Sequence, residues 1–303
     1  MNTPSNAIPE SQVVWPAMAR AMFSSTRPFL WSLRRELWEY RAIYLVPLGA
    51  AAVFTFGFLI NIINVRRKIR TVAWQMPHAS TPYEISAALI MGTALLVGLY
   101  YALDALYGER RDRSILFWKS LPVSDLTAVL SKFTVAIVIV PLFSLAVTMV
   151  TQLVMLLLSS IVFLGSGVSV GELWAQSSFL RISLTYFYHI ITVHGLWYAP
   201  IYAWLLLVSV GAPRAPLIWA VVPPFVICGL EKIAFNTTYC FAIVRDRFLG
   251  SPEHAMVGKN APKGLAQLIP HHFFSEPGLW IGLGIAAVFL AVAVRLRRYR
   301  GPI

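Results

Sequence analysis

The chain has 303 residues, of which 58% are hydrophobic and only 13% are charged, and its mean hydropathy is +0.68. Soluble domains are typically about 45–50% apolar and about 25% charged, so this composition excludes a water-soluble globular enzyme or binding module. The formal net charge of +12 is carried by short basic groups beside apolar segments, which favours anionic lipid headgroups over nucleic acid as their partner.

Residues 1–27 are polar, contain proline and lack the apolar centre of a signal peptide, so we expect a cytosolic tail followed by a single membrane domain over 28–303. The stretch PFLWSLRRELWEYR at 28–41 predicts an amphipathic helix lying in the membrane interface. The alternative is an ordinary anchor for the first span. The residues that define the two faces of this helix and its interfacial tryptophan are Leu30, Leu33, Arg34, Arg35, Leu37, Trp38 and Arg41.

Long apolar stretches then predict about six transmembrane helices, since about 20 residues of helix cross the hydrocarbon core. We expect spans at 43–63, 85–107, 128–164, 182–210, 215–244 and 277–294. The third is longer than one crossing needs, so it must tilt, project or break near Pro141. The fifth is interrupted by Glu231 and Lys232, which predicts a broken or re-entrant helix. The fold class is therefore an all-α polytopic membrane protein with an N-terminal interfacial helix.

An even number of spans puts both termini on one side, and we expect that side to be the cytosol. More of the 25 Lys and Arg residues then lie inside, including the tail 295–300. The basic group at 66–70 falls outside under this topology, against the usual bias. Small residues four apart, as in Ala88/Gly92, Ala94/Gly98 and Gly282/Ala286, predict faces where a second helix approaches closely.

The loop 107–124 between the second and third spans combines arginines with the apolar run Ile115–Trp118 and ends at a proline. A short helix with exposed aromatic residues at the cytosolic face predicts a docking element for another protein. The alternative is a surface helix lying among the headgroups. The residues expected to make the contact are Arg113, Ile115, Phe117, Trp118, Lys119, Leu121 and Pro122.

Polar residues inside the spans have two interpretations. His194, Tyr198 and Tyr202 are four residues apart and share a helix face, where they would line a substrate path or, as we favour, hydrogen-bond neighbouring helices. Glu231 and Lys232 would act as a gate or substrate contact, or would end a broken helix.

We expect no catalytic residue and no metal site. Cys228 and Cys240 indicate neither a disulfide framework nor a CxxC site, and His271 and His272 are weak metal ligands without nearby carboxylates. GxxxxGK[ST] and HExxH are both absent. Any nucleotide chemistry must therefore lie on a partner.

Three motifs together resemble a known family. They are RRELWE at 34–39 with Pro47 after it, the charged segment 107–113 leading to SLPVS at 120–124, and Lys132 before the third span. In these the chain is similar to the type-2 membrane domains of ABC transporters.

The resemblance implies an exporter permease in the cytoplasmic (inner) membrane, working as two permease copies with two ATPase subunits that bind ATP and Mg²⁺. It implies that Arg113–Ser124 contacts the ATPase and that re-entrant helices lie between 231 and 277. A secondary transporter or channel that works alone is the main rival, and a membrane-embedded enzyme is the third candidate.

Overall fold

The computed structural model describes residues 26–69, 81–121, 123–164, 170–177, 179–249 and 273–303, and within these ranges the chain forms helices and no strand. The first half contains α2 (Thr26–Glu39), α3 (Ala42–Ile69), α4 (Thr81–Asp104), α5 (Tyr107–Arg111), α6 (Ser114–Ser120), α7 (Asp125–Thr134), η1 (Val135–Ile139) and α8 (Val140–Phe163). The second half contains α9 (Val170–Ser177), α10 (Phe179–His189), η2 (Ile190–Trp197), α11 (Ala199–Gly211), α12 (Pro216–Phe235), α13 (Tyr239–Leu249), η4 (Phe273–Ser275) and α14 (Pro277–Tyr299).

Five of the described helices are long and apolar enough to cross a membrane, namely Ala42–Arg67, Thr81–Arg111, Asp125–Phe163, Pro216–Phe235 and Pro277–Tyr299. A sixth crossing exists if the bent pair Phe179–Trp197 and Ala199–Gly211 is one span. The fold is thus all-helical and compatible with a multi-pass membrane protein, with five or six crossings where the sequence predicts about six.

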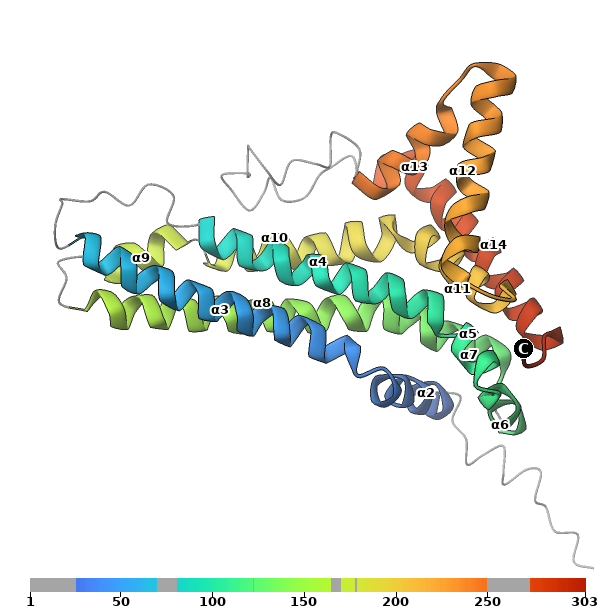
Figure 1. Ribbon diagram of the computed structural model, residues 1–303, viewed down its shortest axis with the longest axis horizontal. Helices are drawn as coiled ribbons and strands as arrows, with labels where there is room; N and C mark the ends of the chain where they lie inside the picture. The colour runs from blue at the N-terminus through green and yellow to red at the C-terminus, as the bar shows by residue number, and fades with distance from the viewer. Residues whose placement is uncertain (1–25, 70–80, 122, 165–169, 178, 250–272) are drawn as a thin grey trace, which may run out of the picture.

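The helices form an elongated bundle. Figure 1 shows α3, α4, α8 and α10 running along the long axis of the molecule, and α3, α4 and α8 pack against one another. α11 packs against α14 and α4, and α12 and α13 stand out from the bundle beside them. At one end of the bundle α2, α5, α6, α7 and the C-terminal end of α14 come together (Figure 1). α2 and the C-terminus therefore lie at the same end.

The long third apolar stretch is one continuous helical run of 39 residues, made of α7, a π-helical turn η1 and α8. Pro141 does not break it. Proline has no N–H and its ring crowds the carbonyl four residues earlier, so a proline inside an α-helix distorts it. Here the π turn lies directly before Pro141 and takes up the distortion, as single π turns in helices commonly do.

The fourth and fifth stretches depart further from the predicted spans. The fourth bends by 50° at Tyr198, between η2 and α11, where Pro200 enters the first turn of α11. The fifth does not continue to residue 244, because α12 ends at Phe235 and Asn236 adopts a left-handed conformation with φ 50°. Asparagine tolerates this conformation better than most residues. α13 then begins a new direction at Tyr239.

The predicted small-residue faces have different outcomes. Ala94 and Gly98 are buried, and a Cβ on Gly98 would meet the Tyr202 hydroxyl at 2.9 Å, so this pair brings α4 close to α11. Ala88 and Gly92 are exposed, and a Cβ on Gly92 would meet no described atom within 4 Å. Gly282 leaves room for the guanidinium of Arg247 rather than for a helix backbone.

Apolar surface is distributed unevenly over the bundle. The largest buried cluster joins α4, η1, α11 and α14 around Tyr101, Val135 and Tyr202. α12, by contrast, buries only Ala220 among its 20 residues. An apolar helix with so much exposed surface needs lipid or another protein around it.

Candidate functional site

The most distinctive feature of the structure is a group of charged side chains buried where α2, α5, α7 and α14 meet. Lys132 Nζ lies 2.8 and 2.9 Å from the two carboxylate oxygens of Glu36 and 3.1 Å from Glu109 Oε1. Glu36 and Lys132 are fully buried, and Glu109 is 3% exposed. One ammonium thus bridges two carboxylates that lie 73 positions apart in the sequence.

Two arginines complete the network from either side. Arg35 donates to Glu109 Oε1 at 2.8 Å and also bonds Glu36. Arg297, which is 3% exposed, donates to Glu109 Oε2 at 3.2 Å and pairs with Asp125. We call Arg35, Glu36, Glu109, Lys132 and Arg297 the ion cluster. Its members come from four helices that adjoin four of the predicted spans.

Neighbouring polar groups extend the ion cluster. The buried Tyr101 hydroxyl donates to Glu36 Oε2 at 2.8 Å, and the ring of Tyr40 packs edge-on against that of Tyr101 with centroids 4.8 Å apart.

Burial alone would lower the pKa of Arg35, but the carboxylates of Glu36 and Glu109 more than offset this and raise it. The guanidinium therefore stays charged.

Burying this many charges is costly unless each is paired and hydrogen-bonded. The ion cluster meets that requirement only when all four helices are in register. Such a network contributes little net stability compared with apolar packing, but breaking one pair leaves an uncompensated buried charge. Its physical effect is to lock these helix ends together as a unit.

The helix α6 is attached to this unit. Arg113 has a left-handed backbone with φ 59°, which turns α6 away from α5. Ile115 is 1% exposed and anchors the helix, whereas Leu116 and Phe117 are each 59% exposed. The Arg35 guanidinium lies 3.9 Å from the centroid of the Trp118 ring.

The predicted docking residues therefore divide into two sets. Phe117 points outward, while Ile115 and Trp118 hold α6 on the bundle. Lys119 Nζ donates to the carbonyls of Arg298 and Arg300 at 3.3 and 3.0 Å, so it tethers α6 to the end of α14. Leu121 follows the helix and is partly exposed, and Pro122 lies outside the described residues.

A second tether joins the loop to α11. Arg110 donates to the carbonyls of Val210 and Ala212 at 2.7 and 3.1 Å. The Ser209 hydroxyl accepts from the backbone N–H groups of Leu106 and Tyr107 at 3.0 and 2.8 Å. The loop that leads into α6 is thereby fixed to the end of α11, in addition to the contacts of α6 with α2 and α14.

The faces of α2 agree only in part with the amphipathic prediction. Leu30 and Trp38 are exposed, as an interfacial helix requires, but Leu33 and Leu37 pack against the protein core. The most buried residue of the helix is Glu36, because it enters the ion cluster. Arg35 turns inward with it, whereas Arg34 and Arg41, the other two predicted outer arginines, stay exposed.

The structure brings His194, Tyr198 and Tyr202 together, although a π-helical turn and a bend separate them. His194 Nε2 and the Tyr202 hydroxyl are 2.9 Å apart and buried, and the His194 ring meets that of Tyr198 edge-on. The Tyr198 hydroxyl donates to the Phe248 carbonyl at 3.2 Å. Their polar atoms bond to each other and to neighbouring backbone, and a role in a substrate path stays a prediction.

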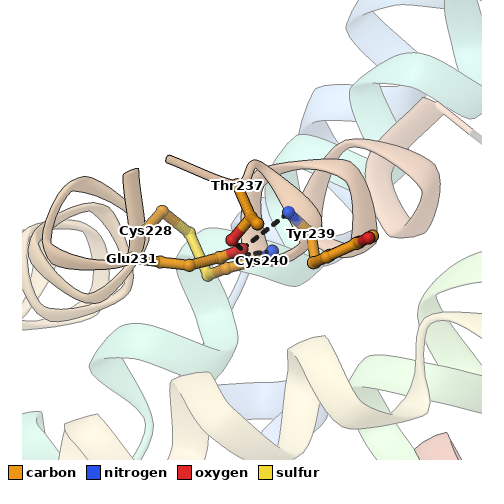
Figure 2. The surroundings of a disulfide bond; sticks show 5 residues. All are labelled: Cys228, Glu231, Thr237, Tyr239 and Cys240. Carbon is orange, nitrogen blue, oxygen red and sulfur yellow. Dashed lines mark hydrogen bonds between the residues drawn. A yellow bond between two sulfur atoms is a disulfide. The ribbon is translucent and has the colours of Figure 1, made fainter. Parts of the chain in front are cut away.

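Glu231 and Lys232 lie in the last turn of α12, and Glu231 binds the next helix. Its carboxylate accepts from the Thr237 hydroxyl at 2.6 Å and from the N–H groups of Tyr239 and Cys240 at 2.8 and 2.7 Å, as Figure 2 shows. Unpaired N–H groups at a helix start are normally satisfied in this way. Lys232 is exposed. A gating role for either residue stays a prediction.

The prediction for the cysteines was wrong. Cys228 and Cys240 form a disulfide that closes the α12–α13 turn beside Glu231 (Figure 2). In one continuous helix, residues 12 apart would be about 18 Å from each other. The left-handed turn at Asn236 instead brings the two Cα atoms to 5.2 Å. We call α12, α13 and this turn the hairpin.

Among the described residues no three His, Cys, Asp or Glu side chains gather in a way that could hold a metal ion. His271 and His272 lie outside those residues, as does all of 250–272, which is the middle of the stretch 231–277 where re-entrant helices were predicted. α13 falls within the predicted re-entrant region and packs against α12. Comparison with protein-family models, curated proteins and solved structures finds no match to this chain.

Of the ion cluster only Arg35 was among the predicted site residues, and only as part of the interfacial helix, yet the signal for the other members lay in the motifs. Glu36 is inside RRELWE, Glu109 is inside the charged segment 107–113, and Lys132 is the lysine before the third span. Only 13 acidic residues occur in the chain. These acidic residues lie at the edges of apolar stretches in a chain with an excess of arginine. That pattern was the available sign that some acidic residues are buried in ion pairs.

Proposed function

We propose that the chain is the membrane-spanning permease subunit of an ABC-type exporter, with ATP and Mg²⁺ bound by a separate ATPase subunit. The observation that carries the proposal is the construction of α6. It presents Leu116 and Phe117 to the outside while Trp118, Lys119 and the neighbouring loop connect it to the helix ends. A partner that pushes on α6 therefore moves the bundle with it.

The exposed surface of α12 supports a second copy of the permease. Leu217, Phe225 and Ile233 are examples of large apolar side chains on this helix that are more than half exposed. Lipid covers part of such a surface, and a second subunit would cover the rest. The proposed working unit has two copies of this chain and two ATPase subunits.

Phe117→Asp tests the proposal most directly. Its side chain is exposed, so aspartate there should leave the fold intact while removing an apolar contact from the docking surface. Trp118→Asp is less informative because it would also disturb Arg35. We expect the chain purified from its native membrane to carry an ATPase, and Phe117→Asp to lose at least about tenfold of the associated ATP hydrolysis.

Tyr299→Asp is the matched control, since it replaces another exposed aromatic residue at the same end of the bundle. It should retain both the ATPase and its activity. Normal ATP hydrolysis and transport in Phe117→Asp would show that α6 is not the docking element. Transport by the purified chain alone would favour a secondary transporter or channel and end the proposal.

A further inference from the structure

A groove of about 560 Å³ lies between α11, the first turns of α12 and the last turns of α14. Arg300 is the one charged residue among its described lining residues. The other walls are almost entirely apolar and include Trp204, Leu207, Val208, Trp219, Val292 and Leu296. Apolar walls with a single cation at one end suit a ligand that has a long apolar part and an anionic group.

The groove runs along the helices for about the depth of one leaflet. Val292 and Leu296 on α14 are followed at the same spacing of four by Arg300, directly after the end of the helix. Eight helical residues cover about 12 Å, and one leaflet contributes about half of a 30 Å hydrocarbon core. The cation therefore lies at the outer end of the groove, where the apolar part of α14 has ended.

Trp204 lies at the inner end, where α12 and α14 approach each other. Its indole N–H donates to the Ala220 carbonyl at 3.0 Å, and its ring meets that of Phe289 with centroids 5.4 Å apart. That carbonyl lacks its usual donor within α12, because Pro224, four residues later, has no N–H. The polar atom of Trp204 is thus already bonded, and what the side chain offers a ligand is apolar surface.

The outer end of the groove carries positive charge that no described carboxylate neutralises. Arg300 is exposed and forms no ion pair with any described residue. Arg110 lies beside it, since its side chain donates to the carbonyls of Ala212 and Gly301, and it likewise pairs with no carboxylate in the part of the chain that is described. A phosphate supplies the negative charge and the acceptor oxygens that a guanidinium binds best.

We propose that this groove holds an acyl chain of an anionic phospholipid from the leaflet at the ion-cluster end of the bundle, with the lipid phosphate on Arg300. The depth of the groove, its apolar walls and its positive outer end together match this ligand. The lipid contacts α12 and α14 at once and fills the space between them. The site does not depend on the proposed exporter function.

Gly211 allows the groove to be filled from the protein side. It lines the groove, it has no positive φ, and a Cβ there would meet no described atom within 4 Å. Gly211→Leu should therefore fold normally and displace part of the acyl chain. By native mass spectrometry of the purified full chain, we expect phosphatidylglycerol binding to fall at least about tenfold, because a few methylenes lose their burial.

Gly284→Leu is the matched control. Gly284 is an exposed glycine of α14 with the same open space around its Cβ position, and it is not among the residues that line the groove. This variant should bind phosphatidylglycerol like the unchanged chain. The unfolding temperature of both variants in detergent checks that the fold is kept.

Arg300→Gln tests the charged end separately. It should lower phosphatidylglycerol binding about tenfold, as expected for the loss of one charge-assisted contact, and so bring it close to that of zwitterionic phosphatidylcholine. Arg298→Gln removes an exposed arginine two residues away that does not line the groove, and it should have no effect.

Three results would overturn the proposal. Unchanged phosphatidylglycerol binding in Gly211→Leu and Arg300→Gln would show that the lipid is not in this groove. Glycerol 3-phosphate that binds as tightly as the lipid would show that the apolar walls hold no acyl chain. Loss of a dimer in Gly211→Leu with lipid binding retained would show that the groove is a contact between two copies of the chain.

Discussion

The ion cluster and the hairpin both hold helix ends in place, but they do so by opposite means. The ion cluster uses buried charges from four helices that are far apart in the sequence. The hairpin uses one covalent bond and one carboxylate cap between adjacent helices, on a surface that is largely exposed. Damage to the ion cluster should therefore spread through the bundle, whereas damage to the hairpin should stay local.

Lys132→Met gives the largest expected effect. Removing the ammonium leaves Glu36 and Glu109 buried beside each other, and breaking a buried ion pair in this way costs about 3–5 kcal/mol. We expect a much lower unfolding temperature in detergent. Arg111→Met is the control, because that side chain is 54% exposed and its pairs should contribute within about 1 kcal/mol. Equal unfolding temperatures for the two variants would show that the ion cluster is not a structural lock.

Cys228→Ser combined with Cys240→Ser should have a smaller and more local effect. A disulfide closing a short loop stabilises by about 2–4 kcal/mol, mainly by restricting the unfolded chain. We expect faster amide hydrogen exchange across α13 and the turn, with unchanged exchange in α7 and α4. Faster exchange at the ion cluster as well would contradict the local character of the hairpin.

Glu231→Ala should give the smallest effect of the three. The N–H groups of Tyr239 and Cys240 lose their acceptor, so their amide exchange should become faster while the disulfide keeps the turn closed. Lys232→Ala, at the exposed neighbouring position, should leave these amides unchanged. Similar exchange in both variants would mean that the carboxylate does not cap α13 in solution.

The positions of the long helices could be predicted from the sequence, because the lipid around them determines their length and composition. Apolar stretches of about 20 residues marked where the long helices lie, because no other arrangement satisfies the backbone in lipid. The bend at Tyr198 was harder to predict, since it lies within an apolar stretch, whereas α12 ends at Phe235, close to the break predicted at Glu231 and Lys232. Hydropathy does not report local backbone geometry.

The ion cluster was unpredictable for a different reason. Lys132 pairs with Glu36, 96 positions away, and Arg297 pairs with Glu109, 188 positions away. Neither pair follows from a local spacing rule, because each depends on which helices become neighbours. The disulfide was missed for the same reason, since the approach of the two cysteines depends on the turn at Asn236. Local patterns indicated which segments matter, and only tertiary contacts assigned the partners.

The π turn at Val135–Ile139 has a consequence for how one helix serves two regions. An extra residue within a helix offsets the side-chain direction beyond it by about 100°. The 39-residue run can thereby aim Lys132 at the ion cluster and Gln152 at the Tyr83 carbonyl, which its amide reaches at 3.1 Å. Deleting a single residue between 135 and 139 would remove the offset and force one of these two ends to face the wrong neighbour.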